Sequence, residues 1–231
     1  MARTPQAPHA QQAPQYIQCM VSDASLRFFD TQFQRQVGEA SLCLNPFEQA
    51  ALPHLRGRVL DYGCGLGNLA LAAARLGCSV VALDGSPTAI RHLHQVALAE
   101  SLPIVAAEAD LRCHELDEDF DAIVSIGLLM FFDCPAALAQ LRQLQAHVRP
   151  GGVAVVNVLV EGTTYLDMFD PAGHCLFGRD ELTAHFAGWD ILLSEQREFA
   201  APHERIKSFA TVVARKPAPA SAAPDPSVAG T

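Results

Sequence analysis

The stretch Val59-Leu60-Asp61-Tyr62-Gly63-Cys64-Gly65-Leu66-Gly67 decides the fold of this chain. An apolar run ends in an acid, glycines follow at alternate positions, and an alanine- and leucine-rich segment, 68–76, comes next. Glycine lacks the Cβ that would keep a turning backbone away from a ligand. A second apolar run ends at Asp84. This order of strand, glycine-rich loop, helix, strand and acid predicts a nucleotide-type cofactor across the carboxyl ends of two neighbouring parallel strands.

The spacing of the glycines separates two classes of cofactor. Dinucleotide binders use G-x-G-x-x-G to bring a pyrophosphate onto a helix end, whereas here Asp61 precedes G-C-G-L-G. An acid beside the loop would repel a pyrophosphate and suits a cationic ligand. We expect the loop to offer unpaired backbone amides, and Asp84 to accept the hydroxyl hydrogens of a ribose. The alternative is that the glycines only form a strand-to-helix turn.

This segment resembles the first motif of the class I S-adenosylmethionine-dependent methyltransferases, a hydrophobic strand that ends in D/E-x-G-x-G-x-G. The resemblance implies S-adenosylmethionine as the cofactor. It places the methionine moiety at Asp61 and at the loop of Gly63, Cys64 and Gly65. It places the ribose at Asp84, with Gly85 and Ser86 at the same strand end. For Cys64, a small residue that fits the turn is favoured over a catalytic thiol, because no base is visible beside it.

Two further strand ends are expected to line the same crevice, because ligands of open α/β sheets bind outside the carboxyl ends of the strands. In the family, the position of Asp110 and Leu111 resembles the acid that contacts adenine and the backbone amide that follows it. Ser125 and Ile126 resemble the strand end beneath methionine and adenosine, where the backbone of Ser125 matters more than its hydroxyl. Asp110 could instead be a solvated loop acid.

The rest of the chain predicts an α/β fold: a doubly wound, seven-stranded, mostly parallel sheet with a C-terminal antiparallel hairpin. Residues 19–216 are expected to form a single domain with an N-terminal helical lid, between disordered tails at 1–18 and 217–231. We expect helices over about 23–37, 46–55, 68–76, 87–100 and 135–148. The expected strands end near Asp61 and Asp84 or span about 103–107, 121–125, 153–160, 188–199 and 205–215.

Composition limits the partners. The net charge is −9 and there is no basic block, which argues against a nucleic acid and favours a small-molecule substrate. No apolar run of about 18 residues and no signal peptide are visible, so we expect no membrane span and a cytoplasmic location. Seven cysteines without any C-x-x-C spacing predict reduced thiols, with neither a disulfide framework nor a metal site. The oligomeric state is not indicated.

The C-terminal half resembles the tellurite-resistance branch of the methyltransferases. The similar pieces are 120–125, 129–131, 149–152, 177–189, 205–211 and 214–216. The resemblance implies methylation of tellurite or a related chalcogen oxyanion, with His203 and Arg205 as catalytic residues that face the substrate. Alternatively, His203 is an exposed turn residue and Arg205 a solvated charge. An organic thiol, amine or hydroxyl acceptor, or a cofactor-binding module without turnover, remain open as other functions.

Overall fold

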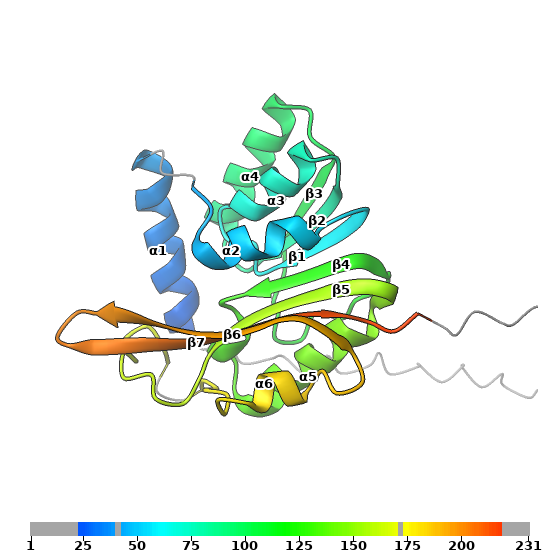
Figure 1. Cartoon of the computed structure of the whole chain (residues 1–231). Coiled ribbons are helices and arrows are strands. Elements are labelled where there is room, and N and C mark those ends of the chain that lie inside the picture. The colour runs from blue at the N-terminus through cyan, green and yellow to red at the C-terminus, as the bar shows by residue number, and fades with distance from the viewer. Residues whose placement is uncertain (1–22, 40–42, 171–172, 219–231) are drawn as a thin grey trace, which may run out of the picture.

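The computed structural model describes residues 23–39, 43–170 and 173–218 of the 231-residue chain. A seven-stranded sheet in the order β3-β2-β1-β4-β5-β7-β6 forms its centre (Figure 1). The pairs from β3 to β5 are parallel, and β7 pairs antiparallel with both β5 and β6. The strands are β1 (Arg58–Tyr62), β2 (Ser79–Asp84), β3 (Ile104–Glu108), β4 (Phe120–Ile126), β5 (Val148–Leu159), β6 (Asp190–Ala201) and β7 (Arg205–Arg215).

Helices cover both faces of this sheet, with α2, α3 and α4 on one face and α5 and α6 on the other (Figure 1). Side chains of β1 alternate between the two layers: Val59 packs with the α3 and α4 side, and Leu60 with the α5 and α6 side. The predicted doubly wound fold with its terminal hairpin is confirmed. The helices are α1 (Asp23–Glu39), α2 (Pro46–Ala51), α3 (Asn68–Arg75), α4 (Pro87–Ala99), α5 (Cys134–Ala146) and α6 (Glu181–Ala184), with 3-10 turns η1 (Leu52–His54) and η2 (Leu129–Phe131).

Side-chain caps explain where helices α2 and α4 begin. The Asn45 side chain accepts from the Phe47 and Glu48 amides, and Glu48 Oε2 accepts from the Asn45 amide at 2.7 Å, which forms a capping box for α2. The Ser86 hydroxyl accepts from the Ala89 amide at the start of α4. Both helices then have proline in their first turn, where its missing amide hydrogen costs no helical hydrogen bond.

One prediction about the cysteines is wrong. Cys134, at the start of α5, forms a disulfide with Cys175, and their Cα atoms are 4.7 Å apart. The two residues are 41 positions apart and follow no spacing motif, so only the fold, which brings the loop before α6 against α5, places them together. Cys43, Cys64, Cys78 and Cys113 are free thiols. Cys19 lies outside the described residues.

The two predicted tails lie outside the described residues, except for the short segment 217–218. Within the described part of the chain, no helix is both long and apolar enough to cross a membrane. In the same residues, histidine, cysteine and acidic side chains form no cluster suited to a metal ion.

Candidate active site

A cavity of about 980 Å³ opens at the carboxyl ends of the parallel strands. In the sheet, β2 lies on one side of β1 and β4 on the other, so the order of the strands reverses next to β1. The cavity lies at this switch point. Its walls come from the ends of β1 to β4, from η2, and from helices α1 and α2. This volume is at the upper end of the range for one drug-sized ligand, about 300–1,000 Å³.

Most of the predicted cofactor residues line this cavity, and two do not. The hydroxyl of Ser86 caps α4 and donates to Asp30 Oδ1 at 2.5 Å. Ser125 is fully buried in β4. The predicted residues that line the cavity are Asp61, Gly63, Cys64, Gly65, Asp84, Gly85, Asp110, Leu111 and Ile126.

Asp61 gives the cavity its chemical character. Its side chain is 4% exposed, and its Oδ2 atom has no hydrogen-bond partner among the described residues. Burial, followed by the charges of Glu48 and Asp84, raises the pKa of Asp61 to about 8. The buried Oδ1 atom of Asn68, which also lines the cavity, has no partner there either. Two unpaired acceptors in a cavity fit a cationic N–H group, because a donor bound there removes the cost of leaving them unpaired.

The prediction that the glycine loop offers unpaired amides is largely wrong. The Gly63 and Cys64 amides both donate to Leu83 O, at 2.8 and 3.0 Å, and the Gly67 amide donates to Cys64 O. The Gly65 amide donates to Asp84 Oδ2 at 2.8 Å. The loop is therefore held mainly by hydrogen bonds to the end of β2, and what the glycines provide is close approach of the backbone. Burial raises the pKa of the Cys64 thiol well above its usual range, which supports a structural role over a nucleophilic one.

Asp84 joins the glycine loop to the start of α4. Its Oδ2 atom accepts from the Gly65 amide, and its Oδ1 atom accepts from the Ser86 amide at 2.8 Å. Burial raises the pKa of Asp84. A carboxylate oxygen has two lone pairs, so each oxygen of Asp84 keeps one acceptor position for a ligand hydroxyl.

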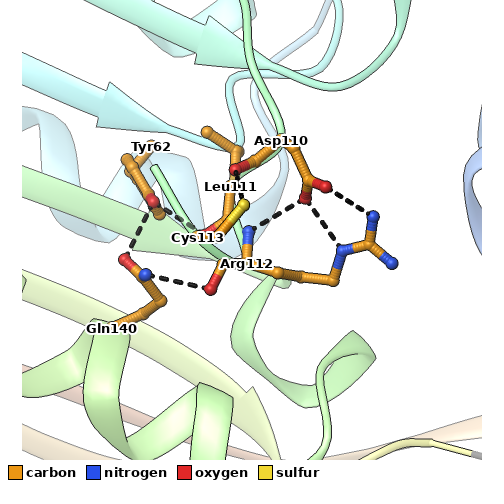
Figure 2. A network of polar contacts seen from close by, with 6 residues as sticks. All are labelled: Tyr62, Asp110, Leu111, Arg112, Cys113 and Gln140. Carbon is orange, nitrogen blue, oxygen red and sulfur yellow. Dashed lines mark hydrogen bonds and ion pairs between the residues drawn. The ribbon is translucent and has the colours of Figure 1, made fainter. Parts of the chain in front are cut away.

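The loop after β3 is fixed by side chains of Tyr62, Arg112 and Gln140 that the sequence analysis did not identify (Figure 2). The buried Tyr62 hydroxyl lies 2.8 Å from Leu111 O and 3.0 Å from Gln140 Oε1. The Gln140 amide donates to Arg112 O at 3.1 Å. Arg112 donates through Nε and Nη2 to the two oxygens of Asp110, both at 2.8 Å. The Asp110 carboxylate is thus oriented by Arg112, and the Leu111 backbone by Tyr62.

Replacing Tyr62 with phenylalanine is expected to loosen this loop without emptying the core. The change removes one buried donor and leaves the Leu111 carbonyl without it, which costs about 1–3 kcal/mol of unfolding free energy. Cofactor affinity should fall by less than in an Asp61 variant, because Tyr62 acts on the cavity only through the loop that carries Asp110 and Leu111. Chemical denaturation and calorimetric ligand titration of the variant measure the two effects separately.

Helix α1 forms the outer wall of the cavity and lies at the end of the sheet to which the β4 arrowhead points (Figure 1). Asp30 accepts from the Ser86 hydroxyl and, at 3.3 Å, from the Thr88 amide, which connects α1 to the start of α4. The Ser25 hydroxyl donates to Met168 O at 3.3 Å. Phe29 and Phe33 of α1 line the cavity, and the Phe29 ring also packs against Phe33 and Phe131.

His203 and Arg205 are not among the described residues that line the cavity. His203 has a φ of 60° in the turn between β6 and β7. Arg205 donates through Nη1 and Nη2 to the Asp167 carboxylate at 2.6 and 2.7 Å, and its guanidinium lies over the Tyr165 ring. Their catalytic role stays a prediction, and the geometry of the cavity adds no support to it.

Comparison with known proteins identifies the domain. A family model described as a methyltransferase domain matches residues 59–152, which contain the glycine loop, Asp84 and Asp110. The chain carries a class I S-adenosylmethionine-dependent methyltransferase domain. S-adenosylmethionine is the cofactor of this class. The methyltransferase domain thus accounts for a cavity that suits a cation at the switch point of the sheet.

Relatives of the methyltransferase domain include the probable S-adenosyl-L-methionine-dependent methyltransferase TehB of Haemophilus influenzae, which is 30% identical over 69% of this chain and 57% of its own length. Hemagglutinin 1 of Eikenella corrodens is 33% identical over 60% of this chain and 46% of its own length. The chain therefore spans about half the length of these curated relatives. The crystal structure of Haemophilus influenzae TehB superposes with a TM-score of 0.66, at 23% identity, over 81% of this chain and 67% of that one, which shows the shared fold.

Three residues in or beside the cavity belong to no sequence motif that would have marked them as site residues. Asn68 begins α3, Tyr62 follows Asp61 along β1, and Glu48 belongs to a capping box. The alternation of strand side chains could have indicated that Tyr62 points to the opposite layer from Asp61. The place of Glu48 depends on how α2 packs against β4, which only the tertiary structure provides.

Proposed function

We propose that this chain transfers the methyl group of S-adenosylmethionine to a small molecule bound under α1. The single observation that carries the proposal is the buried, unpaired carboxylate oxygen of Asp61 in a large cavity at the switch point of the sheet. S-adenosylmethionine has a protonated amino group and a sulfonium, and when bound it supplies an activated methyl group. An acid-lined cavity suits both of its positive groups.

Different residues of the cavity would contact different parts of the cofactor. Asp61 and Asn68 would hold the amino group, because each has a buried acceptor without a partner. Asp84 would accept from the ribose hydroxyls, and Asp110 with the Leu111 amide would contact the adenine. Gly63, Cys64, Gly65, Gly85 and Ile126 would form the contact surface, with Ser86 and Ser125 supporting it from behind. The chain's contribution to rate would then be positioning and the exclusion of water by α1.

Tellurite or a related chalcogen oxyanion is one candidate acceptor. The resemblance to the tellurite-resistance branch and the TehB relatives favour it. An organic thiol, amine or hydroxyl acceptor is the alternative. A small-molecule substrate, the exclusion of nucleic acid and a cytoplasmic location follow from the composition and stay predictions.

The direct test is calorimetric titration of the protein with S-adenosylmethionine and S-adenosylhomocysteine, followed by measurement of S-adenosylhomocysteine release with tellurite, selenite, thiols, alcohols and amines. Saturable binding together with release that requires an acceptor is the expected result. Binding without release for every acceptor would instead identify a cofactor-binding module. The absence of binding would overturn the proposed function.

Asp84→Asn tests the ribose assignment. Asparagine keeps one side-chain acceptor for the Gly65 or Ser86 amide and loses the other, so the ribose hydroxyls compete for fewer acceptors. We expect the binding free energy of S-adenosylmethionine to weaken by about 1–3 kcal/mol while the protein stays folded. Unchanged affinity in a folded variant would remove Asp84 from the site.

A further inference from the structure

The charges that line the cavity constrain the acceptor. The described residues contribute five carboxylates to its wall, from Glu48, Asp61, Asp84, Glu108 and Asp110, and one guanidinium, from Arg112. That guanidinium is bonded to both oxygens of Asp110. The cofactor adds one net positive charge. An acceptor that enters the loaded cavity therefore still meets an excess of negative charge.

Aromatic rings form the other distinctive part of the wall. Phe29 and Phe33 of α1 and Phe131 of η2 line the cavity, and the Phe29 and Phe131 rings meet edge to face with centroids 4.9 Å apart. Aromatic faces attract ammonium groups, and carboxylates near such rings strengthen that attraction. The combination of rings and acids matches an organic cation and does not match an oxyanion.

Glu48 is the acid of this wall that the cofactor assignment leaves unused and that lies near the methionine end. Glu48 and Asp61 both line the cavity, and the charge of Glu48 adds to the effect of burial in raising the pKa of Asp61. Burial raises the pKa of Glu48 itself. Its Oε2 atom accepts only a backbone hydrogen bond from Asn45, so no described cation neutralises this carboxylate.

We propose that the acceptor is an amine with an apolar body, and that Glu48 binds its ammonium group beside the phenylalanine rings of the lid. This inference rests on the proposed methyl transfer and specifies its substrate class. The alternative acceptors carry a negative charge or develop one when they react: tellurite is an oxyanion, a thiol attacks as a thiolate, and a hydroxyl gains alkoxide character as it loses its proton. An amine is cationic when bound and neutral when it reacts. The proton that it loses from nitrogen passes to the Glu48 carboxylate, which becomes a neutral carboxylic acid. The freed nitrogen lone pair would then form the bond to the methyl carbon as the methyl–sulfur bond breaks, and S-adenosylhomocysteine would leave.

Ternary binding tests the inference without turnover. Protein saturated with S-adenosylhomocysteine is titrated with phenethylamine, phenethyl alcohol, phenylacetate and selenite. We expect the amine to bind at least about tenfold more tightly than the matched carboxylate, and this preference to shrink as salt is added. If phenylacetate or selenite binds as tightly as the amine, the inference is overturned. Failure of S-adenosylhomocysteine itself to bind would overturn the proposed function instead.

The variant Glu48→Gln tests whether Glu48 causes the preference for the amine. Glutamine can still accept the Asn45 amide in the capping box, so α2 should keep its start. The variant should lose about tenfold in affinity for phenethylamine, with S-adenosylhomocysteine affinity within about threefold of the original chain. Glu161→Gln, an exposed residue in the turn after β5, makes the same charge change outside the cavity and should alter neither affinity.

If Glu48→Gln stays folded in a thermal melt and keeps its affinity for the amine, Glu48 is only a helix cap and the inference is wrong. An equal loss in Glu48→Gln and Glu161→Gln would attribute the preference to net charge and would also overturn the role of Glu48. S-adenosylhomocysteine release with phenethylamine, alcohol and selenite then completes the test. Release with selenite in the absence of release with any amine would overturn the amine class.

Discussion

Asp61→Asn is expected to abolish tight S-adenosylmethionine binding and, at neutral and alkaline pH, to stabilise the cofactor-free protein. Breaking a buried charge pair by removing one partner costs about 3–5 kcal/mol, which corresponds to at least about a hundredfold loss of affinity. Asparagine has nearly the same shape and keeps an acceptor oxygen, so the loss reports the charge. Calorimetric titration of the variant measures it directly.

The stability change has a defined sign. The pKa of Asp61 rises from 3.8 to about 8 in the folded protein, so between these values the folded state holds a proton that the unfolded state has released. The contribution of this proton to stability is full below about pH 4 and is lost as the pH rises to about 8. At about 1.4 kcal/mol per pH unit, the upper bound for this shift from 3.8 to about 8 is about 6 kcal/mol. The melting temperature of Asp61→Asn should therefore exceed that of the original chain by an amount that grows across this interval.

Two controls separate charge from position. Asp117→Asn removes an exposed acid outside the cavity and should change neither affinity nor the pH dependence of melting. In the original chain, affinity for S-adenosylmethionine should rise with pH up to about 8, because binding of the cation requires the ionised carboxylate. A pH-independent affinity, or equal melting differences at pH 5 and pH 8, would contradict the assignment of Asp61.

The sequence predicted which residues lie at the strand ends of the site, but it did not predict which hydrogen bonds those residues make. The run 59–67 and Asp84 placed the cofactor at two strand ends because glycine spacing and an acid after a strand are local features, and the cavity lies there. Asp110, Leu111 and Ile126 were placed by the same rule for parallel strands. The state of the loop amides was not predictable, since their acceptor Leu83 O belongs to another strand.

The sequence did not predict which side chains interact with one another when they lie far apart along the chain. Tyr62 and Gln140 are 78 positions apart, and only the packing of α5 on β1 makes them neighbours. The same limit applied to the disulfide of Cys134 with Cys175. Arg205 looked like an anion-binding residue, but Asp167, 38 positions earlier, already accepts from its guanidinium. Residue type and spacing indicate which chemistry is available, and tertiary structure decides which groups are already paired.

Gly65→Val is expected to lower affinity for S-adenosylmethionine by at least about a hundredfold, equivalent to about 3 kcal/mol. Gly65 has a φ of 51°, and it lines the cavity between Asp61 and Asp84. A Cβ at this position would lie 3.2 Å from Cζ of Phe33, so the added side chain would occupy the space between the loop and α1. Calorimetric titration gives the affinity, and a thermal melt in the absence of cofactor gives the cost to the fold.

Gly77→Val supplies the matched control for backbone strain. Gly77 has a φ of 92°, which is also in the region that side chains rarely adopt, but a Cβ there would meet no atom within 4 Å. It is not among the described residues that line the cavity. Placing a non-glycine residue in left-handed backbone costs about 1–2 kcal/mol, so both variants should melt earlier than the original chain. Only Gly65→Val should lose the cofactor. If the two variants lose stability alike and both keep their affinity, the glycines only form a turn, and the loop has no direct part in binding.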